Sequence, residues 1–378
     1  MSIDSKIAIL CITENGQKLG IKIQEVLDDG HIYYIRNNSS LTENEEDSIH
    51  KQAKVQRINS RVKTFVGEIF DKYDYIIFIM ATGIVVRSIA DFVSSKFSDP
   101  AILVVDEQGK NTISLLSGHM GGANEMTLYI SKLINSNPVI TTATDVNKKS
   151  ALDIIAKNLD GHIDNFRDSV KEINSMLVNN KPVGMYIDGD YDIDTRGFEV
   201  LDNSKSLSEL YENNKSIFDE YKKIVVISNK KEIEHTNQDI NREKFIKLVP
   251  KDIVVGIGCR KNIDSLELQN AFIDFLNTHN IDIKSIKEIG SIEIKKHEKA
   301  IIDLCKYLEV PFKTISVSEI CEVDYLFDKS DWVKQNVGVY SVAEPVAYIL
   351  SDRNLIIEKQ KYKGITFSVG RLKIWYML

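Results

Sequence analysis

The sequence contains few cysteines, only four in 378 residues. They are Cys11, Cys259, Cys305 and Cys321. No two of them have the CxxC spacing of common zinc sites, and their scatter does not indicate a disulfide framework. This pattern favours a reducing compartment, so we expect the protein in the cytoplasm.

The sequence also lacks an excess of positive charge, because 48 Lys and Arg stand against 55 Asp and Glu, a formal net charge of -7. General nucleic-acid-binding proteins normally show a basic excess or stripe, so we expect no nucleic acid as a partner. No segment approaches the roughly 20 apolar residues that span a bilayer, and the first residues do not resemble a signal peptide. We therefore expect no membrane partner.

What the sequence does contain is an alternation of strand-like and helix-like segments, the pattern of α/β folds. Its length exceeds what one hydrophobic core usually organises, which favours two or three domains. Residues 73–80 form a continuous apolar run, typical of a parallel strand covered on both faces. We predict a parallel-sheet amino-terminal α/β domain over 1–148 and a separate α/β carboxyl-terminal domain over 249–378. Residues 149–248 are a middle module or a linker region between them.

Polar and glycine-containing loops follow the predicted strands of the first domain. They are residues 81–83, 106–107, 117–122 and 141–145, the last ending a strand predicted over 138–145. Ligands bind at the carboxyl ends of parallel strands, so we expect these four loops on one edge of the sheet. The candidate binding residues there are Thr82, Gly83, Arg87, Thr142 and Asp145.

The segment SLLSGHMGGANE, residues 114–125, places three glycines around a single histidine. The glycines are Gly118, Gly121 and Gly122. They would permit positive φ and let a carboxylate or phosphate approach the amides that open the next helix. His119 would then act as an acid, a base or a hydrogen-bond donor. A tight connection with a packed histidine is the alternative. The spacing of His119 and Glu125 matches no pair of metal ligands on one helix face, so we predict no protein-bound metal.

The carboxyl-terminal domain offers a second set of polar residues. The run GIGCR, residues 256–260, follows a strand and precedes a helix, but it lacks the third glycine and the lysine of phosphate loops. Ser341 and Glu344 have the spacing of a capping box, and capping alone would explain both. Arg260, Lys359 and Lys361 offer positive charge to an acidic ligand, or else are solvated surface residues.

Two sets of longer segments are distinctive. The first set is IIFIMATGIVVRSIA, DPAILVVDEQG, ISLLSGHMGGANE and VITTATDVN. The second set is VVGIGCRKN, SIEIKKHEKAIIDLCKYLEVPF, SVAEPVAYIL and EKQKYKGITFSVGR. In this order they resemble the amino-terminal and carboxyl-terminal domains of the cobalt-precorrin-5A hydrolase family (CbiG) of anaerobic cobalamin biosynthesis. The middle region resembles the family only in position and length, and Pro345 stands where the family often has alanine.

This resemblance implies a hydrolase that opens the δ-lactone of cobalt-precorrin-5A and releases acetaldehyde to give cobalt-precorrin-5B. It implies catalysis by His119 and Glu125, with Asp145 and Glu344 as further candidates for the base. Cobalt belongs to the substrate, so we expect no flavin, nicotinamide or protein metal as cofactor. The expected substrate-binding residues are Thr82, Gly83, Arg87, Gly118, Gly121, Gly122, Thr142, Asp145, Arg260, Ser341, Glu344, Lys359 and Lys361.

Two other classes of protein stay open from the sequence. One is a non-catalytic module that binds a corrinoid intermediate and hands it to neighbouring cobalamin-pathway enzymes. The other is a different α/β enzyme that acts on a phosphorylated or nucleotide ligand. Acetaldehyde release separates the hydrolase from the first class, and tight nucleotide binding would favour the second.

Overall fold

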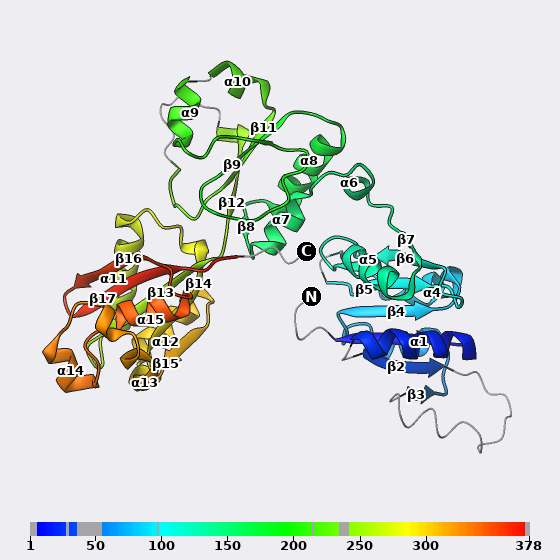
Figure 1. Cartoon of the computed structure of the whole chain (residues 1–378), viewed down its shortest axis with the longest axis horizontal. Coiled ribbons are helices and arrows are strands. Elements are labelled where there is room, and N and C mark those ends of the chain that lie inside the picture. The colour runs from blue at the N-terminus through cyan, green and yellow to red at the C-terminus, as the bar shows by residue number, and fades with distance from the viewer. Residues whose placement is uncertain are drawn as a thin grey trace. The chain divides into compact units, whose positions relative to one another are not determined.

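The computed structural model describes residues 6–27, 30–35, 55–96, 98–213, 215–233 and 242–374. The chain forms two compact units, Met1–Asn147 and Lys148–Leu378. Figure 1 shows the first unit in blue to cyan and the second in green to red. Within the described ranges, no helix is long and apolar enough to cross a membrane.

The first unit is built on a seven-stranded sheet with the strand order β3-β2-β1-β4-β5-β6-β7. Its strands are β1 (Ile7–Cys11), β2 (Gly30–Ile35), β3 (Val55–Ile58), β4 (Tyr75–Ile79), β5 (Ala101–Val105), β6 (Asn111–Leu116) and β7 (Asn137–Val139). Its helices are α1 (Glu14–Leu27), α3 (Val62–Ile69), α4 (Thr82–Ile89), α5 (Ala123–Ile134) and α6 (Ala143–Val146). The α/β fold class predicted for this region is confirmed.

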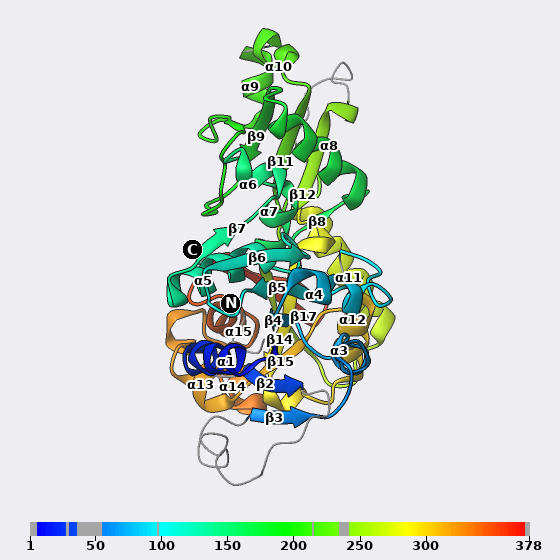
Figure 2. The ribbon, with the colours of Figure 1, turned by 90° about the vertical axis from the view of Figure 1, so that its right-hand side faces the viewer.

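The central strands are apolar along their whole length because helices cover both faces of the sheet. Ile77 and Ile79 of β4 pack in a core with α1 and α5, whereas Ile76 and Phe78 pack in a second core with α3 and α4. Figure 2 shows these two pairs of helices on opposite sides of β4 and β5. The continuous apolar run at 73–80 is thereby explained.

Strands β5 and β6 form an antiparallel hairpin, with Ile102 opposite Leu116 and Val105 opposite Thr112. Strand β7 pairs in parallel with β6. Both therefore run opposite to β1, β4 and β5, which are parallel to one another. The predicted parallel-sheet domain is confirmed as a sheet dominated by parallel pairs, in which β6 and β7 run opposite to the other five strands.

Asp106 fixes the turn of this hairpin. Its carboxylate accepts hydrogen bonds from the amides of Gln108, Lys110 and Asn111. Burial on its own would raise the pKa of Asp106, but these donors and the Asn111 side chain hold it below its usual value. Asp106 is thus a structural residue of the turn.

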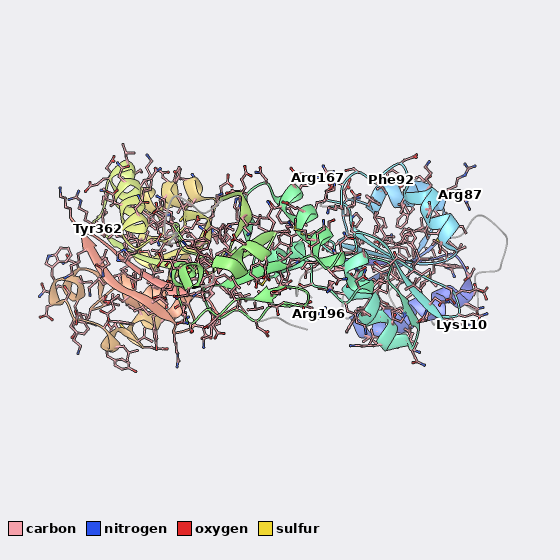
Figure 3. The ribbon with its side chains drawn as sticks, turned by 90° about the horizontal axis from the view of Figure 1, so that it is seen from above. Arg87, Phe92, Lys110, Arg167, Arg196 and Tyr362 are labelled. Atoms are coloured by element: carbon pink, nitrogen blue, oxygen red, sulfur yellow. The ribbon has the colours of Figure 1, made fainter. Side chains whose placement is uncertain are left out.

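The hairpin overturns the expectation that four loops share one edge of the sheet. Loops 81–83 and 106–107 follow β4 and β5 at one edge, whereas 117–122 and 141–145 follow β6 and β7 at the other. At about 3.3 Å per residue, a strand of β4's length separates the edges by roughly 16 Å. Figure 3 shows Arg87 and Lys110 at the end of the first unit where β4 and β5 finish.

The strand predicted over 138–145 is also corrected. Strand β7 ends at Val139, because β6 offers it partners only from Asn111 to Ile113. Thr142 is the N-cap residue of the short helix α6 that follows. Thr142 and Asp145 therefore belong to a loop and a helical turn.

The middle region has a sheet of its own, ordered β10-β9-β11-β12-β8, so it is a module and not an elaborated connection. Its strands are β8 (His162–Ile163), β9 (Val183–Ile187), β10 (Glu199–Val200), β11 (Lys223–Ile227) and β12 (Phe245–Val249). Its helices are α7 (Leu152–Asn158), α8 (Phe166–Val178), α9 (Leu207–Asn213) and α10 (Lys215–Glu220). One face of the sheet packs against α7 and α8, and the other against α9 and α10.

The carboxyl-terminal region forms a third sheet, ordered β15-β14-β13-β17-β16, and its separate α/β fold is confirmed. Its strands are β13 (Ile253–Cys259), β14 (Ile286–Ile292), β15 (Phe312–Ile315), β16 (Leu355–Tyr362) and β17 (Ile365–Arg371). Its α-helices are α11 (Ser265–Thr278), α12 (Lys299–Leu308), α13 (Val317–Cys321), α14 (Asp331–Val337) and α15 (Ala343–Leu350). Helices α11 and α12 cover one face of the sheet, while α13 and α15 pack on the other.

Glycines let α15 lie directly on the backbone of this third sheet. A Cβ added to Gly256 would lie 2.8 Å from the amide nitrogen of Ala347, and one added to Gly370 would lie 2.7 Å from the Ala347 carbonyl oxygen. Gly256 and Gly258 lie inside β13 and not in a loop. The structure therefore contradicts the phosphate-loop interpretation of GIGCR, because these glycines serve helix packing.

A buried polar cluster joins the middle and carboxyl-terminal modules within the second unit. Asp252, which is fully buried (0% exposed), accepts hydrogen bonds from Nε of Arg371 at 2.7 Å and from the hydroxyl of Tyr191 at 2.8 Å. The guanidinium of Arg371 lies 4.7 Å from the centroid of the Tyr191 ring. Burial, reinforced by the Asp252 charge, raises the pKa of Tyr191 well above its usual value. Tyr191 thus remains a neutral donor to Asp252.

Candidate functional site

His119 and Asp145 form a hydrogen-bonded pair at the edge where β6 and β7 end. Nε2 of His119 lies 3.0 Å from Oδ2 of Asp145 and 2.9 Å from Oγ1 of Thr144. The His119 side chain is 16% exposed and that of Asp145 is 42% exposed. An ionised carboxylate only accepts, so Nε2 donates to Asp145. The carboxylate thereby orients the ring and stabilises its protonated form, as a general base requires.

Asn124 connects this pair to the rest of the sheet edge. Its Nδ2 donates to Oδ2 of Asp145 at 3.0 Å and to Oγ1 of Thr142 at 2.9 Å, while its Oδ1 accepts from the hydroxyl of Ser114 at 2.7 Å. The residue is buried in the first turn of α5. The predicted binding residues Thr142 and Asp145 are thus brought to His119, and Asn124 holds them there.

The glycines of the loop allow its own atoms to pack closely together. A Cβ on Gly118 would lie 2.7 Å from Oδ1 of Asn124, and one on Gly121 would lie 2.7 Å from the carbonyl oxygen of Ser117. Of the three glycines only Gly122 has a positive φ, at 85°. The expectation of positive φ at Gly118 and Gly121 is therefore wrong; both are glycine because neighbouring atoms fill the space of a Cβ.

Three amides that open α5 already have acceptors in the loop. Gly122 donates to the carbonyl of His119 at 3.0 Å, and Ala123 and Asn124 donate to the carbonyls of Ser117 and Gly118 at 3.2 and 3.0 Å. These amides are not available to a ligand, contrary to the expectation from the glycine pattern. In the part of the chain that the structure describes, the amides of Met120 and Gly121 have no protein acceptor. Within the described residues the amides of Gly118 and Glu125 likewise have no protein acceptor, so several donors remain for an anion beside His119.

Glu125 is exposed in the first turn of α5. Burial, followed by the charges of Glu125 and Asp74, raises the pKa of Tyr75 at the start of β4. Glu125 therefore contributes negative charge to this edge of the sheet. The carboxylate that contacts His119 is that of Asp145, whereas the sequence analysis placed Glu125 before it as a catalytic candidate.

The other predicted residues of the first unit lie at the opposite edge. The N-cap of α4 is Ala81, without a side-chain cap, so Thr82 is the first helical residue and not the cap. A Cβ added to Gly83 would lie 3.4 Å from the guanidinium of Arg87, which is exposed. These residues form a surface separate from that of His119.

In the second unit, Glu344 is held in a buried ion pair. Its Oε2 lies 2.9 Å from Nζ of Lys359, and their side chains are 8% and 15% exposed. The hydroxyl of Ser341 donates to the same oxygen at 3.2 Å. The N-cap of α15 is Val342, so the capping-box interpretation of Ser341 and Glu344 is wrong. The spacing of three residues instead brings the Ser341 hydroxyl and the Glu344 carboxylate into one hydrogen bond.

The remaining predicted cations differ in their surroundings. Nη2 of Arg260 binds both carboxylate oxygens of Glu267, at 3.0 and 2.8 Å. Lys361 is exposed, and within the described ranges it has no ion-pair partner. A carboxylate ligand would meet Lys361 directly, but would compete with Glu267 for Arg260.

No cluster of three or more His, Cys, Asp or Glu in the described residues is placed to hold a metal ion. The four cysteines are free thiols, and burial raises the pKa of Cys259 to about 11. The sequence analysis did not single out Ser114 or Asn124, whereas Thr144 belongs to the predicted loop 141–145. The sequence does contain an indication for Asn124. Asparagine is a poor helix former, so its presence in the first turn of a helix suggests that its side chain makes a specific hydrogen bond.

The fold and the site define a three-sheet α/β protein with a histidine–carboxylate pair on its first sheet. Three family models match the chain in order. They are "Cobalamin synthesis G N-terminal" over residues 64–145, "Cobalamin biosynthesis central region" over 150–241 and "Cobalamin synthesis G C-terminus" over 253–370. The similarity thus includes the middle module, where the sequence motifs gave only position and length.

Two curated relatives are both named cobalt-precorrin-5A hydrolase. The chain is 38% identical over 306 residues to the cobalt-precorrin-5A hydrolase of Salmonella typhimurium, covering 80% of this chain and 83% of the relative. It is 26% identical over 374 residues to that of Priestia megaterium, covering 96% and 94%. A cobalamin biosynthesis protein G homologue from Sulfolobus solfataricus, 22% identical with 97% of each chain covered, aligns with a TM-score of 0.38, too low to bear on the fold. The chain belongs to the cobalt-precorrin-5A hydrolase family.

Proposed function

We propose that this protein hydrolyses cobalt-precorrin-5A, opening its δ-lactone and releasing acetaldehyde to leave cobalt-precorrin-5B. The observation that carries the proposal is the match of all three modules to one family, with a relative of that name covered over 83% of its length. The His119–Asp145 pair supplies the acid–base group that such a reaction needs.

The geometry supports a two-stage reaction. In the first stage His119 takes a proton from water as it attacks the lactone carbonyl, and Asp145 stabilises the imidazolium. The amides of Met120 and Gly121 donate to the oxyanion, and the proton on His119 passes to the leaving alkoxide.

In the second stage His119 removes the proton of the freed 1-hydroxyethyl group. The bond between this group and the ring then breaks, so that the carbonyl of acetaldehyde forms and the electron pair passes into the conjugated ring. The proton returns to the ring, and the overall change is addition of water and loss of acetaldehyde. We propose that no flavin, nicotinamide or protein-bound metal takes part, since cobalt enters with the substrate.

The direct test is to incubate the purified protein with cobalt-precorrin-5A under anaerobic conditions. We expect one equivalent of acetaldehyde, trapped as its hydrazone, and a corrinoid product whose mass reflects gain of water and loss of acetaldehyde. Tight binding of the corrinoid without any acetaldehyde would instead favour a handover module. Turnover that requires an added flavin, nicotinamide or metal would contradict the proposed chemistry.

We propose that Lys361, an exposed cation of the second unit, binds a carboxylate of the substrate. Lys361→Ala should weaken substrate affinity about two- to fivefold at low salt and less at high salt, because exposed ion pairs contribute little and are screened. Lys363→Ala is the matched control, since Lys363 is also exposed and lies two residues away. Equal losses for both variants, independent of salt, would exclude Lys361 as a specific contact.

We further propose that the protein works in the cytoplasm and passes its product to neighbouring enzymes of the cobalamin pathway. The free thiols of all four cysteines support a reducing compartment. Cell fractionation with activity in the membrane or secreted fraction would contradict this placement.

A further inference from the structure

We propose that Asn124 is a positioning residue that holds Asp145 against His119. The inference rests on the proposed function of the same site. Oδ2 of Asp145 receives two donors, Nε2 of His119 at 3.0 Å and Nδ2 of Asn124 at 3.0 Å. The side chain of Asn124 is therefore the link between the reactive pair and the body of the sheet.

The orientation of the Asn124 amide is fixed by the chemistry of its partners. The carboxylate of Asp145 only accepts, so the NH₂ group must face it, and the carbonyl oxygen must face the hydroxyl of Ser114. The second N–H of this group reaches Oγ1 of Thr142 at 2.9 Å. Residues from two segments of the chain thus hold one amide, and Asn124 is only 5% exposed.

The glycine pattern of the loop fits this role. A side chain at position 118 would collide with Oδ1 of Asn124, because a Cβ there would lie at 2.7 Å. The backbone of Asn124 also donates to the carbonyl of Gly118 at 3.0 Å. The loop that carries His119 is therefore folded around Asn124, and this couples the position of the histidine to that of its carboxylate.

Replacing Asn124 with aspartate keeps the shape of the side chain but removes both donors and adds a carboxylate. The titratable groups already on the surrounding elements are Tyr75, Asp99, Glu125 and Asp145. Asp99 is occupied by the amides of Ser94 and Ser95. The added negative charge one hydrogen bond beyond Asp145 favours the imidazolium and raises the pKa of His119. His119 must be neutral to act as a base. When the pH is lowered, the Asn124→Asp variant should therefore lose activity at a higher pH than the wild type does.

For Asn124→Asp we expect the turnover number to fall about 10- to 100-fold, the range typical of groups that orient a reactive residue. The acid limb of its pH profile should move upward by roughly one unit, with little change in KM. Asn124→Ala should also lose turnover but without that shift. Asn174→Asp is the matched control: Asn174 likewise donates to a buried aspartate, Asp153, at 2.9 Å, but in the middle module. It should lower stability and leave the pH profile unchanged.

A folded Asn124→Asp protein with normal turnover and an unmoved acid limb would overturn the proposal, as would a loss no greater than that of Asn174→Asp. NMR titration of the His119 ring gives a readout that needs no turnover, with His119→Asn used to assign the signal. An upward shift of the His119 titration in Asn124→Asp supports the positioning role even if the wild-type protein releases no acetaldehyde. In that case the proposed function fails while the link between Asn124 and His119 stands.

Discussion

Replacing His119 with asparagine is expected to lower the turnover number for acetaldehyde release by about 10² to 10⁴, the usual contribution of general acid–base catalysis. Asparagine keeps a short polar side chain in place of the ring, but it cannot carry a proton near neutral pH. Substrate affinity and melting temperature should therefore stay close to those of the wild type. All three quantities are measured on the same preparation.

His162→Asn is the control for this experiment. His162 also places Nε2 at 3.0 Å from a carboxylate, that of Asp164, but it lies in the middle module. Its replacement should leave turnover nearly unchanged. If His119→Asn is folded and turns over normally, His119 is not the proton-transfer group, and Glu125 or Glu344 becomes the next residue to test.

The second large effect is expected for stability. Arg371→Met leaves the carboxylate of Asp252 fully buried with Tyr191 and Asn229 but without its cation. Breaking a buried ion pair on one side costs about 3–5 kcal/mol of unfolding free energy, because an uncompensated charge remains in the interior. The sequence of the first unit contains no tryptophan, so urea unfolding followed by tryptophan fluorescence measures the second unit alone.

Two further variants make the stability result specific. Arg196→Met removes a cation from an exposed pair with Asp194 in the same unit, and should cost no more than about 1 kcal/mol. Adding Asp252→Asn to Arg371→Met should recover part of the loss, since the buried charge is then gone. Equal losses for Arg371→Met and Arg196→Met would show that the buried cluster does not stabilise the junction.

The sequence predicted the individual strands of the first unit better than their directions. A run such as 101–105 is apolar whether its neighbour is parallel or antiparallel, so hydrophobicity could not give the direction of β6. The short connection did indicate a turn at 107–110 between the two strands, and its length favours an antiparallel pair. Only residues 106–110 join β5 to β6, whereas a parallel crossover needs a dozen residues or more.

For the candidate site, the sequence located the loop but not its internal partners. His119 stood out because it is flanked by glycines, and Asp145 was among the candidates, yet nothing in the pattern joined them across 26 residues. Their contact depends on β6 and β7 ending side by side, which is a tertiary fact. The contact of Lys359 with Glu344 and its neighbour Ser341 is likewise a tertiary fact, because it requires α15 to pack on β16.

The antiparallel hairpin of the first unit also has an evolutionary consequence. It places the loop of His119 and the start of α4 at opposite ends of the same strands, roughly 16 Å apart. Sites that far apart and without shared partners usually change independently, with additive effects. Selection can therefore vary Thr82, Gly83 and Arg87 without disturbing the His119–Asp145 pair. A single inverted hairpin thus gives one small domain two surfaces that can diversify at different rates.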